Sequence, residues 1–174
     1  MSLSSFNPQG PAEVFPGMLV VPGGGFTHYV HSSGAAGLDL LPPGMASPSP
    51  ASFETTINAA LAKCRSNRGD TVVVLPGHTE SVSSADYLSS LGTKTGVTVQ
   101  GLGYGANKPT LTWTVAGSTL LFDAAGFRMR NFNFYLAGVH TAGSALTVAA
   151  PITVSADSCE MTDIDAWWGF DANQ

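Results

Sequence analysis

The sequence predicts an all-β protein, a short parallel β-solenoid that is preceded by one helix and an extended arm. Three observations predict it: a helix pattern that runs directly into a β-branched strand, alternating segments that recur at similar spacing, and an unusual composition. Only 11% of the 174 residues are charged, against about a quarter in a typical protein, and Gly (20) and Pro (11) are frequent. Stacked parallel strands need no charged face, and their turns demand Gly and Asn.

Residues 1–51 are predicted to form an arm, and residues 52–174 the folded domain. Pro and Gly clusters interrupt the arm before any element can lengthen, although short strands are expected at residues 18–21 and 28–31. The arm nevertheless carries many large apolar side chains, including Phe6, Phe15, Leu19, Phe26 and Tyr29. These favour an arm that packs on a partner, and the alternative is an arm that wraps only its own domain.

The domain begins with a helix signal. Apolar residues recur at helical spacing, and Ser52 is placed to cap the first turn: the stripe is Phe53, Ile57, Ala60, Leu61 and Cys64. Gly69 ends the helical pattern. Residues 71–75 then form an uninterrupted β-branched run closed by Pro76 and Gly77, which predicts a strand buried on both faces.

A loose repeat follows the helix and strand. Residues 96–102, 126–134 and 151–161 each alternate apolar and polar side chains, and shorter apolar runs lie at 110–115, 118–122 and 145–148. Repetition at this spacing is typical of a solenoid, in which Asn131 would sit at a bend and satisfy turn backbone groups. A β-sandwich, which also has short strands and Gly turns, is the alternative.

Charge and motifs argue against several kinds of site. The net charge is −5 and there is no basic stripe, so nucleic acid is not an expected partner. His28 and His31 would face opposite sides of an extended segment, and the two cysteines are expected to be buried free thiols, so no metal site and no cofactor are predicted. No signal peptide or membrane span is recognised, which predicts a protein that is soluble, not classically secreted and without a membrane partner.

The candidate acids and bases form no convincing catalytic set. Arg128 and Arg130 are expected on one outer strand face, and His78 and His140 on the surface. The candidate acids are expected at a solvated end: Asp123, Asp157, Glu160, Asp163 and Asp165. We therefore predict no catalytic residues.

Residues 53–61, 69–80 and 96–161 together resemble the pectin-lyase-like family of right-handed parallel β-helices. The resemblance implies a right-handed coil whose open N-terminal end is capped by the helix. Enzymes of this fold are usually much longer, and they need clustered acids that hold Ca²⁺ or paired carboxylates in a cleft. The shortness of this chain makes an enzyme the second choice.

Short acidic β-helices with an apolar arm and an aromatic end resemble trimeric spike and decoration proteins of tailed bacteriophages. This resemblance implies a non-enzymatic virion protein, made in the host cytoplasm and located on the capsid surface, where a homotrimer binds the major capsid protein. The expected partner-binding residues lie in the arm and at the aromatic end: Phe6, Phe15, Leu19, Phe26, Tyr29, Trp167, Trp168 and Phe170. The alternatives are a tailspike-like protein and a protein that binds or cleaves glycans.

Overall fold

A computed structural model describes residues 25–41, 53–136 and 151–168. None of the described helices is long and apolar enough to cross a membrane. The elements, in chain order, are β1 (Thr27–Val30), the 3-10 helix η1 (Gly34–Leu40), β2 (Phe53–Glu54), α1 (Ile57–Lys63), β3 (Thr71–Val74), β4 (Thr79–Val82), β5 (Thr98–Gly101), the 3-10 helix η3 (Gly105–Asn107), β6 (Thr110–Trp113), β7 (Leu120–Phe122), β8 (Arg128–Leu136), β9 (Ile152–Val154) and β10 (Glu160–Trp168).

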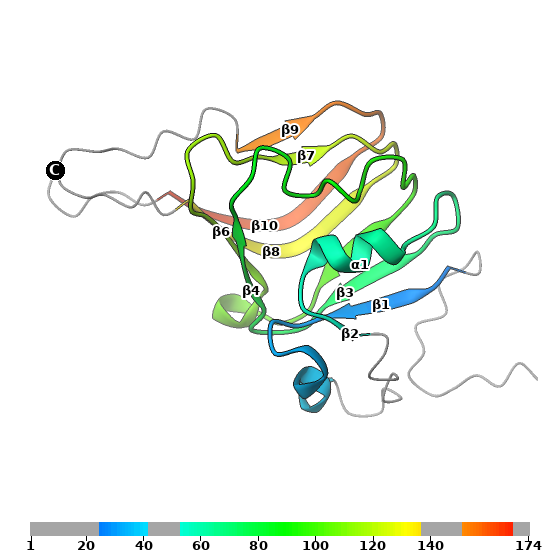
Figure 1. The fold of residues 1–174 in the computed structure, drawn as a ribbon. Helices are drawn as coiled ribbons and strands as arrows, with labels where there is room; N and C mark the ends of the chain where they lie inside the picture. Colours follow the sequence, from blue (N-terminus) through cyan, green and yellow to red (C-terminus); the bar gives the residue numbers. More distant parts are fainter. Residues whose placement is uncertain (1–24, 42–52, 137–150, 169–174) are drawn as a thin grey trace, which may run out of the picture.

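The strands form one large parallel sheet with β8 as its junction (Figure 1). The first part of β8 pairs with β5, which continues to β3, β1 and β2, while its second part pairs with β6, which continues to β4. β10 pairs with β8 along almost the whole length of both strands. The strands β7 and β9 form a separate parallel pair.

This arrangement corrects the predicted fold class. The expectation of a right-handed parallel β-helix is wrong: the described residues show no closed solenoid but a mostly parallel sheet with one α-helix, closer to an α/β fold. The physical reason lies in β8, because this one strand joins two branches into a continuous bent sheet. The predicted segments 96–102 and 126–134 do contain β5 and most of β8, and Thr71, Thr98, Arg128 and Glu160 stand side by side at chain spacings of 27, 30 and 32 residues. The third segment, 151–161, instead contains β9, and most of β10 was not predicted.

The helix begins later than the sequence predicts. Thr56, not Ser52, caps α1: its backbone is extended and its hydroxyl accepts the Ala59 N–H at 3.1 Å. Phe53 and Glu54 instead form β2, beside β1. α1 ends at Lys63, well before Gly69, because Cys64 has an extended backbone.

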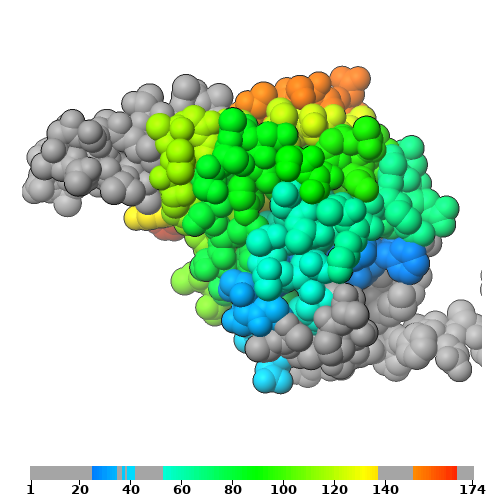
Figure 2. All heavy atoms as spheres, viewed as in Figure 1, coloured from blue at the N-terminus to red at the C-terminus, as the bar shows by residue number. Residues whose placement is uncertain are grey.

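α1 covers one face of the sheet and completes the main core. Figure 1 shows the helix lying over β1 and β3, and in Figure 2 its cyan atoms occupy the middle of the face in view. Ile57 and Leu61 are fully buried against Val72 and Val74, as the apolar stripe predicts. On the opposite face of the sheet, Val73 belongs to a second, smaller cluster, so β3 is buried on both faces.

The first branch of the sheet also includes part of the predicted arm. β1 lies between β2 and β3, and Tyr29 stacks on Phe53 with 5.5 Å between the ring centroids. For these residues the structure shows the alternative expectation, a segment that packs on its own domain. The predicted strands at 18–21 and 145–148 lie outside the described residues.

The turns before β3, β5, β8 and β10 each contain a residue with a left-handed backbone conformation, and these four residues form a column across neighbouring turns. Gly69, Gly96, Gly126 and Ser158 have φ values of 68°, 71°, 70° and 59°, and each stands two residues before one of the paired positions of β3, β5, β8 and β10. The Gly126 N–H donates to the Asp157 carbonyl at 3.0 Å, which links neighbouring turns. Ser158 is the only member of this column with a side chain, so it carries the steric cost of the left-handed region.

The substitution Ser158→Gly is expected to stabilise the protein by about 1 kcal/mol, because glycine adopts this conformation without a Cβ clash. Urea unfolding followed by circular dichroism measures the change. Ser155→Gly is the matched control: Ser155 is exposed in the same connection and has no positive φ, so this change should be neutral or destabilising. A loss of stability in Ser158→Gly would contradict the prediction.

Candidate functional site

A buried polar network lies where α1 meets β4. Both oxygens of the Glu80 carboxylate accept the Ile57 N–H, at 3.0 and 3.1 Å, so Glu80 binds the first residue of the helix. The same carboxylate accepts a hydrogen bond from the Tyr87 hydroxyl and one from Nε2 of His78 at 2.8 Å. The Glu80 side chain is 6% exposed and His78 is fully buried, which corrects the expectation that His78 lies on the surface.

The hydrogen bonds of the network show which nitrogen of His78 donates to Glu80. Because a carboxylate only accepts hydrogen bonds, Nε2 of His78 carries the proton, and Nδ1 is buried without a partner among the described residues. Burial, the Glu80 charge and the hydrogen bond to Glu80 together raise the pKa of Tyr87 above its ordinary value. All three contacts of Glu80 are internal, and the arrangement is suited to holding α1 against the sheet.

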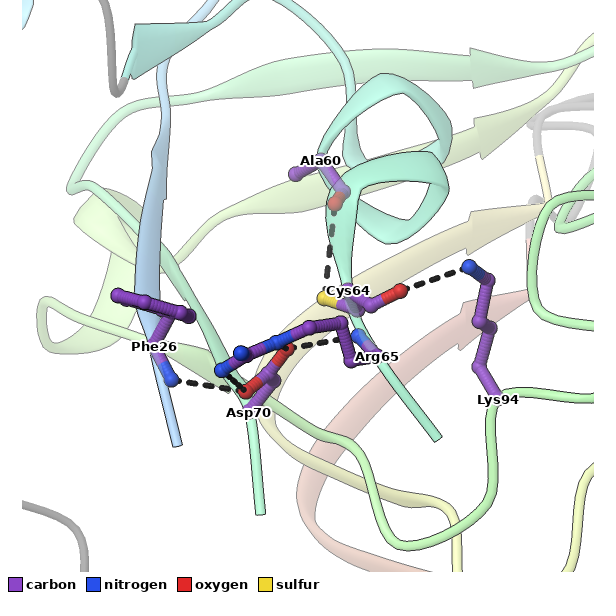
Figure 3. Close-up of polar contacts among 6 residues, drawn as sticks. All are labelled: Phe26, Ala60, Cys64, Arg65, Asp70 and Lys94. Carbon is purple, nitrogen blue, oxygen red and sulfur yellow. Dashed lines mark hydrogen bonds and ion pairs between the residues drawn. The ribbon is translucent and has the colours of Figure 1, made fainter. Parts of the chain in front are cut away.

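A second polar cluster surrounds Asp70 at the other end of α1 (Figure 3). The fully buried Asp70 carboxylate accepts the Phe26 N–H at 2.8 Å and the Arg65 N–H at 2.7 Å, and the Arg65 guanidinium lies 3.4 and 3.5 Å away. The guanidinium carbon of Arg65 also lies 4.0 Å from the centroid of the Phe26 ring. Asp70 therefore joins the chain before β1 to the chain after α1.

Cys64 and His28 lie beside this carboxylate. Cys64 Sγ contacts the Ala60 carbonyl at 3.5 Å, and Lys94 Nζ donates to the Cys64 carbonyl at 2.7 Å. One ring nitrogen of His28, the Cys64 sulfur and a carboxylate oxygen of Asp70 all lie within 4.8 Å of one another. The sequence did not predict this group, because His28 lies 36 residues before Cys64 and the three residues follow no metal-binding spacing.

The environment shifts the pKa of all three groups. Burial raises the pKa of Cys64 to about 12, and the Asp70 charge adds to the effect. Burial also lowers the pKa of His28, because its effect is larger than that of the Asp70 charge, which acts to raise this pKa. Burial alone would raise the pKa of Asp70, but the N–H groups of Phe26 and Arg65 and the guanidinium outweigh it and leave this pKa below its ordinary value.

The outer face of β6, β8 and β10 carries a groove of about 530 Å³. Strand register places the side chains from these strands in two rows: Thr110, Asn133 and Asp165 are neighbours in a polar row, and Tyr135 and Trp167 are neighbours in the next row along the strands. Tyr135 is 44% exposed and Trp167 60% exposed. The groove is lined by Gly105, Ala106, Thr110, Asn133, Tyr135, Asp165 and Trp167.

Hydrogen bonds hold the polar side of the groove in place. Lys108 Nζ donates to Asp165 Oδ2 at 2.8 Å, and Asn133 Nδ2 donates to the Gly105 carbonyl at 3.1 Å. Asn131, which has φ 61° within β8, donates to the carbonyls of Gly101 and Gly103 at 2.9 and 3.1 Å. Asn131 thus binds backbone carbonyls at and after the end of β5, as predicted, but it lies within β8 and not at a bend between two strands. The groove itself is a surface of aromatic and polar side chains.

The predicted partner-binding residues have different environments. Trp167 is exposed in the groove, Phe26 is 53% exposed beside Arg65, and Tyr29 is buried within the chain's own sheet. Trp168 belongs to β10, but its side chain is not described. Phe6, Phe15, Leu19 and Phe170, like His140, lie outside the described residues.

The candidate acids are dispersed. Asp123, Asp157 and Asp163 are exposed, and Glu160 forms ion pairs with Arg128 and Arg130, which share the outer face of β8 as predicted. Of the five acids, only Asp165 lines the groove. The two cysteines are free, as predicted, but Cys159 is only partly buried.

The geometry thus offers two kinds of site, an exposed aromatic groove suited to binding and a buried cluster of mixed ligand atoms under α1. Comparisons of the chain with protein-family models, with curated proteins and with solved structures found no match, so the function is argued from these sites.

Proposed function

We propose that this chain is a non-enzymatic structural protein of a bacteriophage virion, a trimeric decoration protein that binds the major capsid protein. The single observation that carries the binding role is the groove, in which Tyr135 and Trp167 stand exposed on neighbouring strands. Large aromatic side chains contribute most of the binding energy in many protein interfaces. The phage assignment itself depends on the resemblance in sequence.

The polar side chains of the described residues support a binding role over a catalytic one. Glu80 and Asp70 use their oxygens for backbone N–H groups and for side chains of their own domain. Glu160 pairs with two arginines at the surface. Among the described residues that line the groove, Asp165 is the one carboxylate, whereas glycoside hydrolysis canonically uses a pair across the scissile bond.

The substitution Trp167→Ala is expected to weaken binding to capsids about thirtyfold, which corresponds to the loss of about 2 kcal/mol for an aromatic anchor at the centre of an interface. Cosedimentation of the purified protein with capsids of the encoding phage that lack it measures the affinity. Light scattering on the purified protein without capsids measures its mass and tests the trimer.

Val115→Ala is the matched control, since Val115 is 46% exposed in the connection between β6 and β7 and does not line the groove. It should leave capsid binding unchanged. Equal capsid binding by wild type and Trp167→Ala would remove the groove from the interface. A wild-type protein that fails to bind capsids would contradict the proposed function itself.

The groove also favours a second candidate, a protein that binds host-surface polysaccharide without cleaving it. The supporting observation is the neighbouring rows: the rings of Tyr135 and Trp167 present apolar faces, while Asn133 and Asp165 present hydrogen-bonding groups beside them. A few placed polar groups in an aromatic site are typical of small-molecule binding. Retention of wild-type protein, but not Trp167→Ala, on immobilised host polysaccharide would favour this candidate over the capsid role.

A further inference from the structure

Three potential metal ligands converge between α1 and the first branch of the sheet. His28 belongs to β1, Cys64 immediately follows α1, and Asp70 immediately precedes β3. A ring nitrogen, a thiol sulfur and a carboxylate oxygen from these residues lie within 4.8 Å of one another. The fold, and not a local motif, therefore assembles the group.

Two members of the group have unused bonding capacity. Nε2 of His28 is buried and has no hydrogen-bond partner among the described residues. Cys64 is 1% exposed, and among the described residues its sulfur has one polar contact, at 3.5 Å with the Ala60 carbonyl. A buried polar atom without a partner is costly and calls for an explanation such as a bound ion.

We propose that His28, Cys64 and Asp70 bind a single Zn²⁺ ion. Imidazole, thiolate and carboxylate are the three ligand types that zinc takes in proteins. Tetrahedral zinc bonds of about 2.0 to 2.3 Å place ligand atoms about 3.3 to 3.8 Å apart, so the side chains need to close by at most about 1.5 Å on binding. Three protein ligands leave the fourth position for water.

Asp70 is already oriented for this role. The N–H groups of Phe26 and Arg65 hold its carboxylate at 2.8 and 2.7 Å, as hydrogen-bond partners behind a metal ligand do. The guanidinium of Arg65 would compete with the ion for the Asp70 carboxylate, but its contacts with Asp70 are long, at 3.4 and 3.5 Å. The Arg65 side chain is 40% exposed, so it can leave the carboxylate and return to solvent.

Zinc binding at this site releases one proton and changes no oxidation state. Cys64 binds as the thiolate, its proton passes to solvent, and no bond is oxidised or reduced. The cations of Arg65 and Lys94 lie close to the site and oppose a divalent ion, which predicts that removing the Arg65 charge strengthens binding.

Titration of the untagged, reduced, full-length protein with Co²⁺ tests the site, because a thiolate ligand gives Co²⁺ a charge-transfer absorption. One equivalent of Co²⁺ is expected to produce this band, and Zn²⁺ should abolish it by displacement. Cys64→Ser should remove the band, whereas the control Cys159→Ser, at the other free cysteine, should retain it. Arg65→Met should raise the Co²⁺ affinity about tenfold.

His28→Gln provides a second test that leaves the thiol in place, and it should weaken Co²⁺ binding at least about tenfold. Circular dichroism verifies that each variant is folded. The absence of a thiolate band at saturating Co²⁺ would overturn the proposal, as would a band that survives Cys64→Ser. Metal binding that is unchanged in both His28→Gln and Arg65→Met would also contradict this site. The proposal is independent of the virion role, since no capsid is used.

Discussion

Glu80→Ala is expected to destabilise the protein by about 3 to 5 kcal/mol, because it removes the acceptor of two fully buried donors and one partly buried donor at once. The Ile57 N–H, the Tyr87 hydroxyl and Nε2 of His78 all point at this carboxylate. Alanine leaves each donor without a partner and also removes the negative charge at the start of α1. Urea unfolding followed by circular dichroism measures the free energy of unfolding.

Two other substitutions separate the network from a general effect of losing a glutamate. Glu80→Gln keeps one acceptor oxygen and should lose about half as much stability. Glu54→Ala removes a carboxylate paired with Lys63, whose side chain is 48% exposed, and should cost about 0.5 kcal/mol. If Glu80→Ala and Glu54→Ala were equally stable, the proposed importance of the network would be wrong.

Asp70→Ala is expected to destabilise the protein by about 3 kcal/mol in buffer with a chelator, because the N–H groups of Phe26 and Arg65 lose their acceptor. The lowered pKa of Asp70 adds a pH signature. The folded state keeps this carboxylate ionised to lower pH than the unfolded state does. Its contribution is therefore complete above the unfolded value of about 3.9 and is lost as pH falls through the lower folded pKa.

Unfolding of wild type and Asp70→Ala in urea, repeated at several pH values between neutral and strongly acidic, measures both effects. The stability difference between the two proteins should be largest at neutral pH and should shrink in acid. Asp39→Ala, at an exposed position, should change stability by less than about 0.5 kcal/mol at any of these pH values. A difference between wild type and Asp70→Ala that does not depend on pH would exclude the ionised carboxylate as its source.

Local patterns predicted most elements but not their assembly. The β-branched run 71–75 predicted a strand buried on both faces, and the alternating segments predicted β5 and β8, because these signals lie within a few consecutive residues. The junction at β8 could not be predicted, since it depends on which strand pairs with each half of β8. That pairing decided the fold class, and the prediction of a closed solenoid failed there.

The candidate sites show the same limit. Trp167 was recognised from an aromatic cluster, but its neighbour Tyr135 lies 32 residues earlier and joins it only through the register of β8 and β10. Glu80 is 23 residues from the helix end that it binds, and Asp70 is 44 residues from Phe26. Such contacts leave no periodic signal in a single sequence.

The junction at β8 also bears on the order of events during synthesis. The β3–β5 pair and the β4–β6 pair can each form once residue 113 has left the ribosome, but nothing in the sheet connects the two pairs until residues 128–136 emerge. Domains begin to fold from the N-terminal side as the chain is made, and contacts between distant residues form slowly. Emergence of β8 is therefore the step that joins the two strand pairs into one sheet. Until then they are linked through α1, which packs on β3 and is bound by Glu80 of β4, so a ribosome stalled before β8 would hold an incomplete, protease-sensitive chain.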